Sequence, residues 1–216
     1  MKKEVVVMKV ALINGSPNQF GCTNRALVEM KNEFIKEGIE AEIYWIGNDA
    51  IASCRGCGAC VNSGKCVIDD CVNEFGKKIA DFDGFIFGSP VHYSAITGSL
   101  ASFMSRLFFS KNRTGHFYLK PAAGITVARR AGCLSAFDQM NKFFTKYEMP
   151  VISSSYWNMV FGSKAEDIEK DEEGLYTLRS LARNMAFFLK CKDVGINNGV
   201  SLPKQETPAR TNFIRE

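Results

Sequence analysis

Short apolar runs alternate with helical patterns along almost the whole chain, and this alternation constrains the fold most strongly. Strand-like runs are expected at residues 9–14, 40–46, 84–88, 122–128 and 150–154. Segments with helical spacing are expected at residues 23–36, 72–80, 98–109, 133–147 and 171–192. Parallel strands need crossover connections, and these are right-handed. The pattern therefore predicts an α/β fold, a doubly wound five-stranded parallel sheet with helices on both faces.

Length and composition suit one globular domain. The chain has 216 residues, of which 46% are hydrophobic and 23% charged, an ordinary balance. We expect a single domain over residues 1–216, with a cysteine-rich loop at 50–71 and an extended tail at 200–216. The net charge is +4, with no basic block longer than a pair, so neither nucleic acid nor membrane is an expected partner. The early apolar run 5–8 is too short for a signal peptide, which predicts a cytoplasmic protein.

The loop after the first strand, residues 14–24 (NGSPNQFGCTN), is a candidate phosphate site. It lacks the lysine of a P-loop and the spaced glycines of a dinucleotide-binding motif. It opens a helix, whose free N–H groups favour phosphate. The sequence indicates either a mononucleotide phosphate or an ordinary turn with Thr23 or Asn24 as helix cap. The neutral side chains available are Ser16, Asn18, Thr23 and Asn24.

Two later loops should meet the first one, because ligands of doubly wound sheets bind beyond the carboxyl ends of the strands. In residues 88–98 (GSPVHYSAITG), a tight turn is followed by two aromatic residues against which a flat ring could lie. For His92 the sequence favours a hydrogen-bonded loop histidine over a catalytic role. Residues 127–133 (VARRAGC) could line the far side of the pocket. Arg129 and Arg130 there either face an anionic cofactor or are solvated.

Together, GSPNxxxxTN after the first strand and GSPVxY after the third resemble the flavodoxin-like NAD(P)H-dependent FMN reductases, over about residues 9–192. The resemblance implies a flavodoxin-like sheet that binds FMN. It implies that the phosphate is held by Ser16, Asn18, Thr23 and Asn24. It also implies that the isoalloxazine contacts Pro90, Val91, His92 and Tyr93, with Ala128, Arg129 and Arg130 nearby. Position 92 is often Tyr or another aromatic residue in such loops, so His92 departs from the family pattern.

Four cysteines lie within residues 54–66 (CRGCGACVNSGKC). In a reducing compartment such a group indicates metal binding or redox chemistry rather than disulfides. Three thiolates at two-residue spacing can wrap one face of a cubane, and Gly56 and Gly58 permit the tight backbone. Zinc, which normally uses two separated knuckles, and thiols without metal remain alternatives. The candidate ligands are Cys54, Cys57, Cys60 and Cys66.

This spacing resembles the C-x2-C-x2-C-x4–7-C motif of the iron–sulfur flavoproteins, a branch of the same family. The resemblance implies a 4Fe-4S cluster; Cys71, at the start of a helix, is left out. The expected function is electron transfer from NAD(P)H through FMN to a small-molecule or protein acceptor, without a catalytic acid–base pair. The alternatives are an NAD(P)H:FMN or quinone reductase without a cluster, and a zinc- or thiol-based sensor. An exposed isoalloxazine edge and the apolar Phe213 and Ile214 predict a homodimer or homotetramer.

Overall fold

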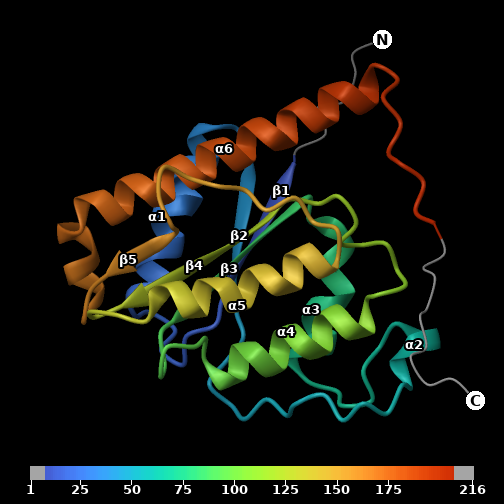
Figure 1. The fold of residues 1–216 in the computed structure, drawn as a ribbon, viewed down its shortest axis with the longest axis horizontal. Coiled ribbons are helices and arrows are strands. Elements are labelled where there is room, and N and C mark those ends of the chain that lie inside the picture. Colours follow the sequence, from blue (N-terminus) through green and yellow to red (C-terminus); the bar gives the residue numbers. More distant parts are fainter. Residues whose placement is uncertain (1–7, 207–216) are drawn as a thin grey trace, which may run out of the picture.

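The computed structural model describes residues 8–206 of the chain. A parallel five-stranded sheet in the order β2-β1-β3-β4-β5 runs through its centre (Figure 1). This is the flavodoxin-like strand order, so the predicted fold class is confirmed. The strands are β1 (Lys9–Asn14), β2 (Glu40–Trp45), β3 (Gly84–Pro90), β4 (Ala122–Ala128) and β5 (Met159–Phe161).

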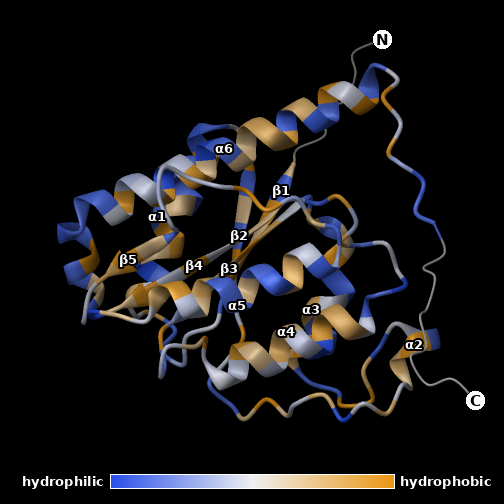
Figure 2. Ribbon diagram, viewed as in Figure 1, coloured by the Kyte–Doolittle hydropathy of each residue, from blue (hydrophilic) through white to orange (hydrophobic). Residues whose placement is uncertain are grey.

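Helices cover both faces of the sheet (Figure 1). Alternation along β3 sends Ile86 into the cluster with α1 and α6, and Phe85 and Phe87 into the cluster with α3, α4 and α5. Figure 2 shows the strands as largely apolar, as expected when both faces of a sheet are buried. The helices are α1 (Cys22–Lys36), α2 (Cys60–Ser63), α3 (Cys71–Lys78), α4 (Gly98–Ser110), α5 (Cys133–Lys146) and α6 (Glu172–Asn197), with 3-10 turns at Ile79–Asp81 and Ala165–Lys170.

The fifth strand lies later in the chain than the sequence predicts. Residues 150–154 do not form a strand; Val151 makes only an isolated bridge to Ala122, at the beginning of β4. The chain then leaves the sheet and returns as β5 beside the end of β4. Asn158 fills the interruption, because its side chain donates a 3.1 Å hydrogen bond to the carbonyl of Gly124. The prediction at 150–154 was wrong because the apolar run there makes only the first contact with β4. The paired strand begins later, at Met159, directly after the polar Asn158, and a polar residue gives no strand signal.

The other predicted elements agree with the structure more closely, with two differences. The short helix α2 was not predicted, and α6 continues to Asn197 rather than ending at residue 192. Of the predicted tail, residues 201–206 are exposed and without regular secondary structure, whereas Phe213 and Ile214 lie outside the described residues. No helix in the described part of the chain is long and apolar enough to cross a bilayer.

A ladder of ion pairs joins α1 to α6 along their shared edge. Glu29 pairs with Arg179 at 2.8 Å, and Glu33 pairs with Arg183 at 2.7 Å. The two glutamates are four residues apart on α1, and the two arginines are four residues apart on α6. The second ion pair therefore lies about one helical turn beyond the first. The ladder fixes the register in which α6 packs over α1.

Candidate functional site

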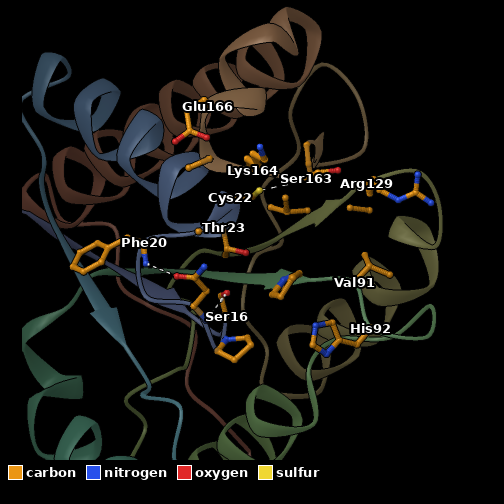
Figure 3. Close-up of a pocket in the computed structure, with 18 residues that line it drawn as sticks. Ser16, Phe20, Cys22, Thr23, Val91, His92, Arg129, Ser163, Lys164 and Glu166 are labelled. Carbon is orange, nitrogen blue, oxygen red and sulfur yellow. Dashed lines mark hydrogen bonds between the residues drawn. The ribbon is translucent and has the colours of Figure 1, made fainter.

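A cavity of about 710 Å³ lies at the carboxyl ends of the strands. Loops that follow β1, β3, β4 and β5 line it (Figure 3). This is where doubly wound sheets place their ligands. Its walls are made of Ser16, Pro17, Asn18, Phe20, Gly21, Cys22, Thr23, Pro90, Val91, His92, Val127, Ala128, Arg129, Gly162, Ser163, Lys164, Ala165 and Glu166.

Hydrogen bonds lock the first of these loops onto the third strand. The N–H of Gly15 donates to the carbonyl of Gly88 at 2.8 Å, and Thr97 Oγ1 donates to the carbonyl of Gly15 at 2.8 Å. A Cβ at position 15 would lie 2.9 Å from the Gly88 oxygen. Glycine is therefore required there, and the two loops meet backbone to backbone.

The N-terminus of α1 opens into the cavity. Its cap residue is Gly21, and no side chain within residues 8–206 caps it, so its first N–H groups lack side-chain acceptors. Thr23 is 1% exposed and lines the cavity, and its hydroxyl is buried without a hydrogen-bond partner. The alternative in which Thr23 or Asn24 caps the helix is wrong. A buried, unpaired hydroxyl beside free helical N–H groups suits an anion.

Beyond β3, the chain makes a tight two-residue turn. His92 and Ala95 exchange backbone hydrogen bonds of 2.9 Å, and Tyr93 and Ser94 between them have φ of 51° and 60°. Such left-handed pairs usually contain Asn or Gly. The turn leaves Tyr93 fully exposed, and it is not among the residues that line the cavity.

The structure gathers eight of the eleven residues proposed from the sequence around this one cavity. Asn24, Tyr93 and Arg130 are not among its lining residues. The sequence reasoning missed the wall at 162–166, because it placed the fifth strand too early. One signal could have found it: Phe161-Gly162-Ser163 repeats the Gly-Ser step that ends the first and third strands. The eight are Ser16, Asn18, Thr23, Pro90, Val91, His92, Ala128 and Arg129.

The four clustered cysteines line a second, much smaller cavity of about 20 Å³. Cys60 is buried at the start of α2, whereas Cys54 and Cys57 are exposed. Gly56 and Gly58 alternate with these cysteines at φ of 65° and 71°, which only glycine adopts at little cost. The backbone can therefore reverse between successive thiols.

The thiols are close enough to influence one another. Burial raises the pKa of Cys60, and the other three cysteines of the loop raise it further by charge repulsion. A positive group bound between them would relieve that repulsion. Even so, in the described part of the chain no three His, Cys, Asp or Glu side chains are placed to share one metal ion. Burial raises the pKa of Cys71 to about 11, which makes this nearby thiol a poor ligand.

The two cavities lie toward opposite ends of α4. Thr97, which caps α4, braces the strand-end loops, whereas Arg106 and Phe109 line the cysteine cavity. The nine residue steps from Thr97 to Arg106 span about 14 Å at a helical rise of 1.5 Å per residue. One rigid helix therefore sets the spacing of both sites.

Comparison with known proteins connects these features. Residues 8–164 match the model of a family described as NADPH-dependent FMN reductase, a span that includes the loops after β1, β3 and β4 and the cysteine loop. The chain belongs to this family. As a member of the FMN reductase family it is an oxidoreductase, and its family membership supports FMN as the cofactor.

Individual relatives place the chain within the iron–sulfur flavoprotein branch of the FMN reductases. It is 31% identical over 194 residues to an iron–sulfur flavoprotein of Methanocaldococcus jannaschii, covering 85% of this chain and 98% of that relative. An iron–sulfur flavoprotein of Methanosarcina thermophila is 26% identical over 187 residues, covering 85% and 96%.

Solved structures support the fold. The flavodoxin, WrbA-like protein from Agrobacterium tumefaciens matches with a TM-score of 0.62 and 14% identity, covering 86% of this chain and 99% of that one. RosB with a bound 8-demethyl-8-formylriboflavin-5′-phosphate matches with a TM-score of 0.67 and 12% identity, covering 97% and 95%. At these identities the likeness shows a shared flavodoxin-like architecture.

Proposed function

We propose that the chain carries electrons from NAD(P)H, through FMN in the strand-end cavity, to a small-molecule or protein acceptor. We further propose that Cys54, Cys57, Cys60 and Cys66 bind a 4Fe-4S cluster that takes part in this transfer. Bound FMN supplies a group that accepts two electrons at once and can release them singly. The protein supplies position, charge and shielding from water.

The unpaired Thr23 hydroxyl carries the FMN proposal. It is a buried donor at the open N-terminus of α1, and a phosphate there would satisfy both the hydroxyl and the free N–H groups. The proposed flavin contacts are the eight predicted residues that line the cavity. Val91 and Ala128, at the ends of the neighbouring strands β3 and β4, supply apolar surface for a flat ring, and Arg129 adds a positive charge.

The shared cavity of four cysteines carries the cluster proposal. Once deprotonated, all four would be ligands of the type that iron–sulfur clusters require, and the relatives are iron–sulfur flavoproteins by name. In a 4Fe-4S cluster each thiolate binds a different iron. The four sulfurs therefore need not converge on one point, as they must around zinc.

A reductase that uses FMN without a cluster is the second candidate. It is favoured by the small volume of the cysteine cavity, about 20 Å³, and by the exposure of two of the four thiols, Cys54 and Cys57. Membership of an oxidoreductase family favours either reductase over the non-enzymatic sensor.

Anaerobic purification tests both parts. We expect yellow protein that releases FMN, is reduced by NADH or NADPH, and holds about four irons and four sulfides per chain after reconstitution. Cys57→Ser should lose most of the iron and keep FMN, because the flavin loops follow other strands. Colourless protein that takes up no added FMN would contradict the flavin site. Wild-type protein that takes up no more iron than Cys57→Ser would establish the second candidate instead.

Thr23 provides a sharper test of the phosphate site. Thr23→Val removes the hydroxyl at nearly constant volume, whereas Thr23→Ser keeps it. One lost charge-assisted bond should weaken FMN binding by about 2 kcal/mol, roughly thirtyfold, in the valine variant only. Equal affinity in both variants would remove Thr23 from the phosphate site.

We also propose assembly into a homodimer or homotetramer. The exposed Tyr93, next to the cavity residue His92, and the exposed apolar residues Val200 and Leu202 in the tail support it. Light scattering at micromolar concentration should give a mass of two or four chains. A monomer under those conditions would contradict this proposal.

A further inference from the structure

Arg106 is a buried cation that the proposed flavin chemistry does not use. It lies on α4, its side chain is 0% exposed, and it forms part of the cysteine cavity. Burying a guanidinium is costly unless every donor is paired. Its partners therefore indicate what it is for.

The guanidinium reaches both ends of the cysteine loop. It donates to the two carboxylate oxygens of Asp70 at 2.5 and 2.9 Å, and to the carbonyl of Ile68 at 2.8 Å. It also donates to the carbonyl of Ala52 at 3.3 Å, on the other side of the loop. Its remaining contact is to a ligand candidate: Nε donates to the sulfur of Cys66 at 3.3 Å.

Cys66 is held by its backbone as well. The side chain of Asn73 accepts from the N–H of Cys66 at 3.0 Å and donates to its carbonyl at 2.9 Å. Asn73 is itself buried in α3. All four cysteines of the loop lie within the described residues, and among their sulfurs only that of Cys66 accepts a hydrogen bond from another side chain. Cys66 is therefore fixed at three points, whereas Cys54 and Cys57 lie on an exposed glycine loop.

We propose that Arg106 is a positioning residue for Cys66, and that its charge and N–H···S contact raise the reduction potential of the cluster. This inference rests on the proposed cluster. Each electron that the proposed cluster accepted would add one negative charge beside the Arg106 guanidinium, which keeps its proton throughout the physiological range. In a buried setting that attraction is weakly screened. Hydrogen bonds to cysteine sulfur are one of the means by which proteins tune iron–sulfur potentials.

Two variants with opposite electrostatic effects test the inference. Arg106→Gln keeps a polar side chain but removes the charge, so the midpoint potential should shift to more negative values. Asp70→Asn keeps a helix cap and leaves Arg106 beside Cys66 without its counter-charge, so the potential should shift to more positive values. A purely structural role would move both variants in the same direction or leave both potentials unchanged.

The measurement is a redox titration of anaerobically reconstituted protein, followed by electron paramagnetic resonance. FMN content serves as the check that each variant is folded. An unchanged potential in Arg106→Gln that still holds a cluster would overturn the inference. If that variant does not fold, Arg106→Met replaces it: methionine has a long unbranched side chain with neither charge nor N–H donor, so a wild-type potential in a variant that still holds a cluster would overturn the inference. Iron uptake by wild type no higher than by Cys57→Ser is a different result, since it defeats the cluster proposal itself.

Discussion

Trp45 donates its indole N–H to the main-chain carbonyl of Ser16 at 2.8 Å. The bond ties the last residue of β2 to the loop that follows β1, directly beside the proposed phosphate site. Trp45→Phe would leave this carbonyl without its donor and loosen the loop. We expect FMN to bind about 1–1.5 kcal/mol more weakly, close to tenfold, in a fluorescence titration.

The matched control is Trp157→Phe. Trp157 is exposed and stacks edge-on against Tyr156, with no part in the cavity wall. FMN affinity should be unchanged in this variant. Equal losses in both variants would show that the effect comes from replacing a tryptophan and not from the bond to Ser16.

Lys164 belongs to the wall that the sequence did not reveal. It brings a cation to the cavity, so Lys164→Gln should weaken the binding of the anionic FMN by about 0.5–1 kcal/mol. The loss should shrink as salt is added, because salt screens exposed charges. Lys170→Gln is the control: Lys170 is the last residue of the 3-10 turn that Lys164 caps, and it lies outside the cavity, paired with Asp167. A salt-independent loss at position 164 would argue against a charge effect.

The ladder between α1 and α6 should make the protein sensitive to acid. Burial alone would raise the pKa of Glu33, but hydrogen bonds from Lys36 and Arg183 outweigh it and lower the pKa below its ordinary value. The carboxylate therefore stabilises the fold above the ordinary glutamate pKa, and this stability is lost as the pH falls through the lowered value.

Glu33→Gln should accordingly destabilise the protein by about 0.5–1 kcal/mol at about pH 7, and by much less at about pH 3. Urea unfolding at both pH values measures this. Glu40→Gln, at an exposed position on β2, is the control and should have little effect at either pH. An equal cost for Glu33→Gln at both pH values would mean that packing, and not charge, is responsible.

Phe108 lies at the centre of the aromatic cluster under β3. Its ring centroid is 4.2 Å from that of Phe117, 5.0 Å from that of Tyr147 and 5.7 Å from that of Phe87. Phe108→Ala should lower the free energy of unfolding by about 3–5 kcal/mol in urea. Phe187→Ala, at a site that is 69% exposed, should change it by less than about 0.5 kcal/mol. Similar costs at both positions would contradict the assignment of this core.

The fold was largely predictable, because β1, β3 and β4 are continuous apolar runs and α1 and α5 have clear helical spacing. The end of the sheet was not, since Asn158 replaces strand hydrogen bonds with a side chain, and no periodic pattern records that. The same error concealed the wall at Lys164. Side chains whose role depends on a partner far away in the sequence could not be predicted, for a different reason. Arg106 lies in an apolar helix with no sequence sign that Asp70 and Cys66 would lie beside it, because its partners are 36 and 40 residues away.

The burial of Arg106 under the cysteine loop has an evolutionary consequence. β2 is an edge strand, so the loop that follows it can be shortened without disturbing the register of the central strands. A substitution that removed only the Asp70 carboxylate, however, would leave the guanidinium buried under an intact loop without its counter-ion, at a cost of about 3–5 kcal/mol. Loss of the whole loop would instead expose the arginine to water and remove that cost. The fold should therefore tolerate a missing loop better than a loop that keeps its length and loses this aspartate.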